Sequence, residues 1–170
     1  MTRAVNVASS TNLALVTPTI TGATITVAST AAPAFNVYNT GGQTLTHNVA
    51  TKLTLNTKEY DTNTNFDTTT NYRFTPTVAG YYFISAFWAL SGTMTGFCAT
   101  YIYKNGSVYK SLGTTNVSAN YTAGFGSSLV YLNGSTDYIE IYATQGSGIS
   151  QTVVAGNQYA WATGFLARSA

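Results

Sequence analysis

From residue 34 onward, the chain alternates between short runs typical of strands and residues typical of turns. Tyr81–Trp88 is apolar at almost every position, which predicts a strand buried on both faces. Asn105-Gly106 is the dipeptide preferred in a tight hairpin with a type I′ turn. Other strands are predicted over 97–103, 108–112, 129–132, 138–142 and 158–166. Because no window has a sustained helical period, the pattern predicts an all-β antiparallel sandwich.

Residues 1–33 follow a different pattern, with one charge, Arg3, and no aromatic side chain. Residues 16–20 and 23–27 alternate with the period of a strand, but Pro18 limits the first run to an edge or isolated strand. We predict an extended N-terminal arm over 1–33, which anchors a head formed by 34–170; the alternative is an unstructured terminus. The apolar residues expected to dock the arm are Leu13, Leu15, Ile20, Ile25 and Val27.

The stretch from 55 to 86 contains an aromatic ladder with a distinctive spacing. Phe74, Gly80 and Tyr82 follow the pattern F-x5-G-x-Y, which resembles the signature of the complement C1q/tumour-necrosis-factor jelly-roll family. Ile84 stands where that family has a further aromatic residue. The interval from Phe66 to Phe74 is one residue longer than in the family, which predicts an enlarged loop around residues 68–70.

Four other segments resemble pieces of the same family in the same order. They are Ala34–Tyr38, Tyr101–Gly106, Leu129–Ile141 and Thr163–Leu166. The resemblance implies an antiparallel jelly roll (C1q/TNF-like) that assembles as a homotrimer. We expect Tyr82, Ile84 and Phe165 at or near the trimer seam, because the chain has more aromatic residues than one small sandwich needs.

The composition of the chain limits the classes of partner that it is expected to bind. The net charge of +2 is too small and too scattered for the basic patch that nucleic-acid binding needs. No stretch approaches the ~20 apolar residues that span a bilayer, so we expect neither nucleic acid nor a membrane as a partner. The single cysteine, Cys98, leaves no intrachain disulfide and is expected to fill a gap in a strand.

Candidate chemistry is sparse. His47 is the only histidine, and nothing near it or Cys98 supports a nucleophile and base pair. Asp61, Asn63, Asn65 and Asp67 resemble the start of a calcium loop, but positions six and twelve hold Phe66 and Tyr72 instead of Gly and Glu. We therefore interpret this segment as a polar loop and expect no catalysis, cofactor or metal.

Three functions stay open. The first is a virion structural protein, either a trimeric capsid decoration (cement) protein of a bacteriophage or a short head fibre. Its arm would dock on the major capsid protein, and its head would lie on the outer surface of the virion. The second is a tail-fibre tip or adsorption module that binds a host glycan or receptor. The third is a secreted C1q/TNF-like ligand, which the missing signal-peptide pattern and missing G-X-Y stalk disfavour.

Overall fold

The computed structural model describes residues 32–170, with the side chains of 117–121 excepted. The predicted arm residues Leu13, Leu15, Ile20, Ile25 and Val27 therefore lie outside the described residues. The elements within the described range are all strands: β1 Ala34–Tyr38, β2 Gln43–Leu45, β3 Thr51–Lys52, β4 Thr57–Asp61, β5 Phe66–Asp67, β6 Arg73–Phe74, β7 Gly80–Lys104, β8 Ser107–Leu132, β9 Ile139–Gln145, β10 Gln151–Val153 and β11 Ala160–Ser169. No helix in this range is long and apolar enough to cross a membrane.

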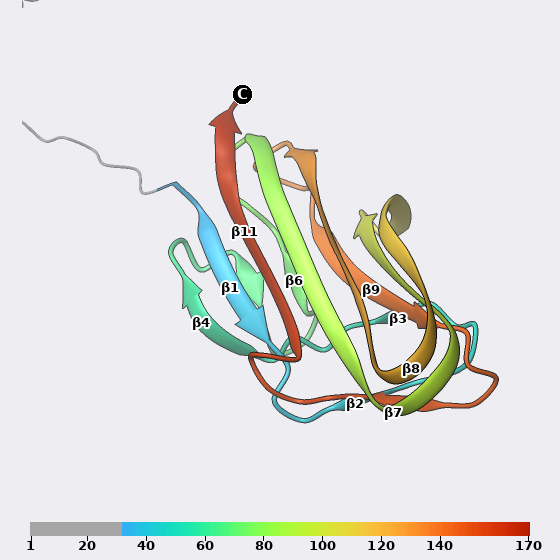
Figure 1. Ribbon diagram of the computed structural model, residues 1–170. Helices are drawn as coiled ribbons and strands as arrows, with labels where there is room; N and C mark the ends of the chain where they lie inside the picture. Colours follow the sequence, from blue (N-terminus) through green and yellow to red (C-terminus); the bar gives the residue numbers. More distant parts are fainter. Residues whose placement is uncertain (1–31) are drawn as a thin grey trace, which may run out of the picture. The chain divides into compact units, whose positions relative to one another are not determined.

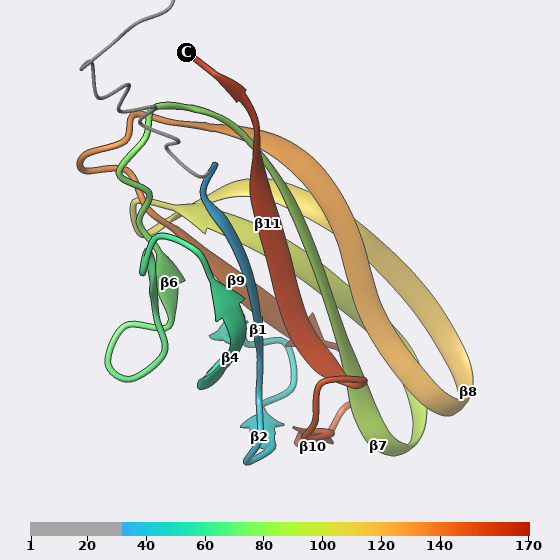
Figure 2. The same ribbon diagram turned by 90° about the vertical axis from the view of Figure 1, so that its left-hand side faces the viewer.

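The strands form one antiparallel sheet that β7 and β8 fold into two layers (Figures 1 and 2). The first half of β7 pairs with β11 and with the second half of β8, and β1 and β4 extend this layer beyond β11. The second half of β7 pairs with β9 and with the first half of β8, and β3, β6 and β5 extend that layer. This all-β antiparallel jelly roll confirms the predicted fold class.

The bend of β7 follows from its glycines. The β7–β8 register shifts between Leu90 and Thr93, and Gly92 and Gly96 have φ values of 104° and 143°. Side chains rarely adopt these angles, whereas glycine adopts them at little cost. A continuous strand can therefore pass from one layer to the other, as Figure 2 shows at the lower right.

The core between the layers contains the aromatic ladder found in the sequence. Phe35, on β1, lies 5.1 Å from Phe66 and 4.5 Å from Phe74, and Phe74 lies 5.4 Å from Tyr82, measured between ring centroids. Each aromatic pair adds about 0.5–1.5 kcal/mol beyond the burial of its area. Deeper along β7, Trp88 Nε1 donates a buried 2.9 Å hydrogen bond to Thr100 Oγ1.

The predicted hairpin at Asn105-Gly106 is confirmed. Asn105 and Gly106 have φ values of 52° and 79°, as a type I′ turn requires at both central positions. The Asn105 side chain also donates to Asp137 Oδ1 at 2.8 Å and accepts from Tyr138 N at 3.0 Å, which ties this hairpin to the loop before β9. The enlarged loop lies between β5 and β6, where Phe66 pairs with Phe74.

Candidate functional site

The layer of β1, β11, β7 and β8 has an apolar outer face. Strand side chains alternate between faces, so residues next to the buried ladder on β7 point away from the core. We call this surface the aromatic face and define it by Tyr81, Phe83, Phe87, Phe125, Leu129, Tyr131, Trp161 and Phe165. Five of these eight side chains are exposed large hydrophobic groups: Tyr81, Phe125, Leu129, Tyr131 and Phe165.

The strand register arranges the aromatic face in rows across the layer. One row runs Trp161–Phe87–Phe125, with ring centroids 6.0 and 6.4 Å apart. A second row places Phe83 beside both Phe165 and Leu129, with 5.5 Å between the phenylalanine rings, and a third pairs Tyr81 with Tyr131 at 5.4 Å. The face thus presents its rings in ordered rows rather than as scattered apolar residues.

A polar row separates the first two apolar rows. It consists of Asn36, Thr163, Ser85 and Ser127, which are Cα partners in successive strand pairs. Because these side chains are short, a depression of about 360 Å³ opens beside the rings of Phe87, Phe125 and Trp161. Ser85, Ser127 and these three rings line the depression, so the middle of the aromatic face is hollowed and combines two short polar side chains with apolar ones.

The predicted seam residues differ in their exposure within the single chain. Tyr82 and Ile84 are 0% exposed within the single chain, because they belong to the inward set of β7 and pack in the core. The outward neighbours on β7 are Tyr81 and Phe83, which are better placed than Tyr82 and Ile84 to contact a second subunit, while the seam itself stays a prediction. Phe165 is 48% exposed and does lie on the aromatic face.

The same alternation corrects the prediction for this strand. Tyr81–Trp88 was expected to be buried on both faces, but Tyr81 is 46% exposed. The apolar outward residues of this strand are uncovered in the single chain.

The side chain of Tyr82 is held on the buried side of β7. Its hydroxyl donates a hydrogen bond to Val78 O at 2.7 Å, and burial raises the pKa of Tyr82 to about 12.

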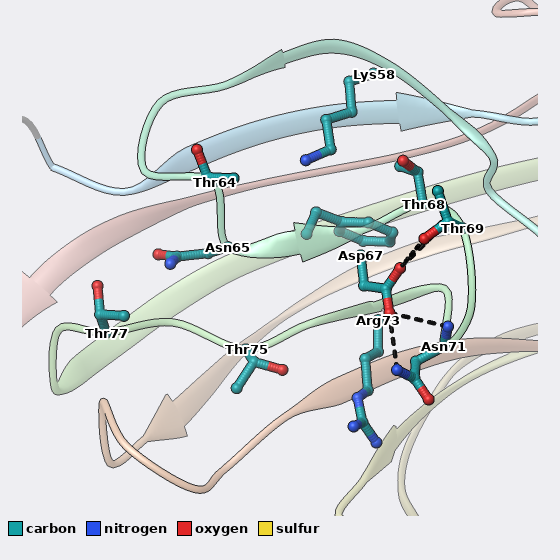
Figure 3. A pocket seen from close by; sticks show the side chains of 11 residues that line it. Lys58, Thr64, Asn65, Asp67, Thr68, Thr69, Asn71, Arg73, Thr75 and Thr77 are labelled. Carbon is teal, nitrogen blue, oxygen red and sulfur yellow. Dashed lines mark hydrogen bonds between the residues drawn. The ribbon is translucent and has the colours of Figure 1, made fainter.

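A second candidate site is a polar pocket of about 520 Å³ formed by residues 58–77 (Figure 3). We call it the polar pocket; its lining residues are Lys58, Thr64, Asn65, Phe66, Asp67, Thr68, Thr69, Asn71, Arg73, Thr75 and Thr77. They come from β4, β5, β6 and the loops that connect and follow these strands. Phe66 is the one apolar residue among them.

The carboxylate of Asp67 holds the enlarged loop closed at the rim of the polar pocket. Its Oδ1 accepts from the backbone N–H groups of Thr70 and Thr69 and from the Thr69 hydroxyl, all at 2.9–3.0 Å. Its Oδ2 accepts from the backbone and side chain of Asn71 at 3.1 and 2.8 Å (Figure 3). These bonds, the Thr70 and Thr69 amides foremost, hold the pKa of Asp67 far below its usual value.

The carboxylate of Asp61 also accepts hydrogen bonds from nearby donors. Burial raises its pKa, but hydrogen bonds from Lys58 and from the backbone of Phe66 and Asn65 outweigh that effect and lower it. Its oxygens accept from Lys58 Nζ, Phe66 N and Asn65 N at 2.8, 2.9 and 3.0 Å. Within residues 32–170, no three His, Cys, Asp or Glu side chains gather as metal ligands. Each of the two aspartates holds a polar loop in place through hydrogen bonds from backbone amides.

The two residues considered for thiol chemistry both lie beside Gln145. Cys98 pairs with Gln145 across β7 and β9, and His47 forms an isolated bridge to it. Cys98 is 0% exposed, and burial raises the pKa of its thiol to about 12, so the thiolate that attacks substrates is not formed near neutral pH. His47 Nδ1 accepts from Gly148 N at 2.9 Å and fixes the loop after β9.

No protein-family model matches the chain, and no curated protein matches it in sequence. Solved structures do resemble it. Murine APRIL is 9% identical over 79% of this chain and 98% of its own, with a TM-score of 0.59. The Eiger TNF of S. frugiperda is 9% identical over 82% and 94%, with a TM-score of 0.59. The globular domain of zebrafish complement 1qA is 22% identical over 82% and 99%, with a TM-score of 0.57.

These structures show that the head has the C1q/TNF jelly-roll fold, as the motif spacing predicted. At such identities they establish the fold alone, because one fold hosts many functions. Sequence reasoning missed both the aromatic face and the polar pocket. The signal for the face was present in the run from Tyr81 to Phe87, whose odd-numbered positions are as apolar as the even ones apart from Ser85. For the pocket, the sequence marked the polar loop at 61–67 and the loop at 68–70, but not that these loops enclose a concave site.

Proposed function

We propose that the chain assembles as a homotrimer through the aromatic face and that the trimer serves as a non-enzymatic structural head. The observation that carries this proposal is the clustering of exposed rings in rows on one face, whose members Tyr81, Phe125, Leu129, Tyr131 and Phe165 are exposed large hydrophobic side chains. Soluble monomers rarely leave large apolar patches uncovered, and aromatic side chains are enriched where proteins associate. The number of three subunits is supported by the resemblance to the C1q/TNF family, and closed cyclic symmetry buries one repeated patch in every subunit.

Light scattering of the full chain at micromolar concentration tests the assembly. We expect three times the mass of the chain for the wild type and the mass of one chain for a Leu129→Asp/Phe165→Asp double variant, because both side chains are exposed on the aromatic face. Ile149→Asp is the matched control, since Ile149 is 64% exposed in the loop after β9, outside the face. A stable wild-type monomer would contradict the proposal.

At the finer level we propose a virion structural protein: a capsid decoration trimer or short head fibre of a bacteriophage, with the head on the outer surface. Support comes from the charge-poor, threonine-rich composition and from the alternating pattern of residues 1–33. Such a segment can add a strand to a sheet edge of the major capsid protein. Three arms in one trimer would bind together and multiply the weak affinity of each.

A shortened chain tests the anchor. The head is the compact unit Ala31–Ala170, and Leu166 N donates to Pro33 O at 2.9 Å, so the cut is placed before Ala31 rather than after residue 33. The 31–170 chain should fold and trimerise but fail to sediment with virus particles that incorporate the full chain. Equal incorporation of both chains would place the anchor in the head and remove the main support for capsid decoration.

The second candidate is an adsorption module, in which the head recognises a molecule on the host surface. The observation that favours it is the polar pocket, a concave site that a purely structural head does not need. Host recognition and decoration make different demands: recognition requires the pocket to bind a ligand, whereas decoration requires the arm to bind the shell. The two functions are therefore separable by experiment.

A further inference from the structure

We propose that the polar pocket binds a neutral saccharide. This inference deepens the adsorption alternative by naming a ligand class, and it does not depend on trimer assembly. The volume of about 520 Å³ falls within the range of about 300–1,000 Å³ typical of small-ligand sites. The class of ligand is therefore inferred from the residues that line the pocket.

Exposed and half-exposed threonine hydroxyls line much of the polar pocket. The side-chain hydroxyls of Thr64, Thr68, Thr75 and Thr77 make no hydrogen bond to another residue in the described part of the chain. Each can donate one hydrogen bond and accept others. A ligand whose own groups are mostly hydroxyls matches this lining, because each of its groups also donates and accepts.

One acceptor in the pocket wall lacks a partner. Asn65 is 8% exposed; its Nδ2 donates to Asn63 O at 3.2 Å, while its buried Oδ1 has no hydrogen bond within residues 32–170. An unsatisfied buried acceptor is costly, and a donor supplied by a bound molecule removes that cost. Thr75 N donates to the backbone oxygen of Asn65 at 2.8 Å, so this residue is fixed beside the threonine hydroxyls.

Each charged side chain that lines the polar pocket already contacts another group of the chain. Lys58 Nζ is 2.8 Å from Asp61 Oδ2, and the oxygens of Asp67 are occupied by its own loop. The Arg73 guanidinium lies over the Tyr138 ring, 4.2 Å from its centroid, and Figure 3 shows its side chain running away from Lys58. Because the Asp67 oxygens accept from their own loop and Arg73 is a single cation that stacks on a ring, the pocket offers no cluster of charges of one sign, and a neutral ligand is favoured.

The polarity of the lining disfavours the other class of neutral ligand, an apolar molecule. An apolar ligand would leave the threonine hydroxyls desolvated without partners, which binding sites avoid. A saccharide instead combines many hydroxyls with a few C–H groups, and Phe66 offers the one apolar side chain against which these can pack. The arrangement thus suits a sugar unit better than a lipid or an aromatic metabolite.

Nuclear magnetic resonance titration of the full chain tests this proposal. The probes are glucose, galactose and N-acetylglucosamine, each as the free sugar and as its methyl glycoside, which mimics a unit linked within a glycan. The pocket variant is Thr75→Val/Thr77→Val, which removes two hydroxyls and keeps the shape. Thr64 is left unchanged because its φ of 55° is unfavourable for valine. Thr44→Val is the control, an exposed threonine of β2 outside the pocket.

We expect at least one sugar to shift the resonances of pocket residues, and the double variant to bind it roughly tenfold more weakly, since two neutral hydrogen bonds are lost. The control and the Leu129→Asp/Phe165→Asp variant should bind as the wild type does, which separates this site from the assembly. Binding of the methyl glycoside would identify a linked glycan unit as the source, and its failure a free sugar.

Three results would overturn the proposal. The first is that no probe binds more tightly than about 10 mM. The second is that the Thr75→Val/Thr77→Val variant binds as well as the Thr44→Val control, which would place the sugar elsewhere. The third is that glucuronic acid, an anionic sugar, binds more tightly than glucose and loses this advantage as salt is added, because the pocket would then recognise charge.

Discussion

At the scale of single residues, the core depends on a glycine that admits a tryptophan. Gly124 faces Trp88 across β7 and β8, and a Cβ at this position would lie 2.5 Å from the indole ring. Gly124→Ala should therefore displace Trp88 from its hydrogen bond with Thr100 and lower the free energy of unfolding by about 1–3 kcal/mol. Urea denaturation at a fixed protein concentration measures this change.

Gly41→Ala is the matched control for this prediction. A Cβ at Gly41 would meet no atom within 4 Å, so the substitution should leave stability unchanged or raise it by up to about 1 kcal/mol. Equal stability of the two variants would show that the contact with Trp88 relaxes without cost.

Asp67 makes a residue-scale prediction about pH. Its pKa is lower in the folded chain than its ordinary value of 3.8, so the ionised form stabilises the fold at neutral pH, and this contribution is lost as the pH falls below 3.8 toward the folded pKa. Asp67→Asn should cost about 1 kcal/mol at neutral pH, because an amide NH₂ would meet the donors of Asn71. Urea denaturation across the acid range should show the difference from wild type shrinking as the pH falls below 3.8.

Two other aspartates keep part of the acid sensitivity in that variant. The pKa of Asp137 is lowered by hydrogen bonds from Asn105 and Lys104, and that of Asp61 is lowered as well. Asp67→Asn should therefore reduce the loss of stability in acid without abolishing it. A difference between wild type and variant that stays constant from neutral pH to well below pH 3.8 would contradict the role given to the carboxylate.

At the scale of elements, adjacent residues of β7 have different roles, because one packs in the core and the next lies on the aromatic face. Tyr82→Phe removes the hydrogen bond to Val78 O and should cost about 1 kcal/mol of stability without changing the oligomer. Phe83→Asp places a charge beside Phe165 on the aromatic face and should give monomers that keep the β-sheet circular dichroism spectrum of the fold. Sedimentation velocity distinguishes the two outcomes. Monomers from Tyr82→Phe and intact trimers from Phe83→Asp would contradict this register of inward and outward residues.

The difficulty of assigning that register from sequence has a physical cause. Along Tyr81–Phe87 both alternating sets are apolar, so the pattern does not indicate which set faces the core. A half-buried strand with polar outward residues would have been assigned correctly. The small residue Gly164 shows which face is crowded, because a Cβ there would lie 2.7 Å from Ile84 and from Phe35, but this contact is visible only in the folded chain.

At the scale of the whole molecule, assembly should couple stability to concentration. If the aromatic face is covered only in a trimer, dilution exposes it and lowers the melting temperature. The Tm measured by calorimetry should therefore rise with the concentration of the wild-type chain, and that of Leu129→Asp/Phe165→Asp should not. A wild-type Tm that is independent of concentration well into the dissociating range would contradict coupling between assembly and stability.

The sequence by itself determined the fold class and the hairpin turn at Asn105-Gly106. These features follow from local pattern: an Asn-Gly pair requires positive φ at two positions, and the spacing from Phe74 through Gly80 to Tyr82 repeats a family signature. The predicted strands 81–88 and 97–103 are instead one continuous strand, β7, and the predicted strands 108–112 and 129–132 both belong to β8. Only the tertiary structure decided which side of β7 is buried and which residues gather in the polar pocket. Both depend on contacts between distant segments, such as Phe35 with Phe74, and no local period records them.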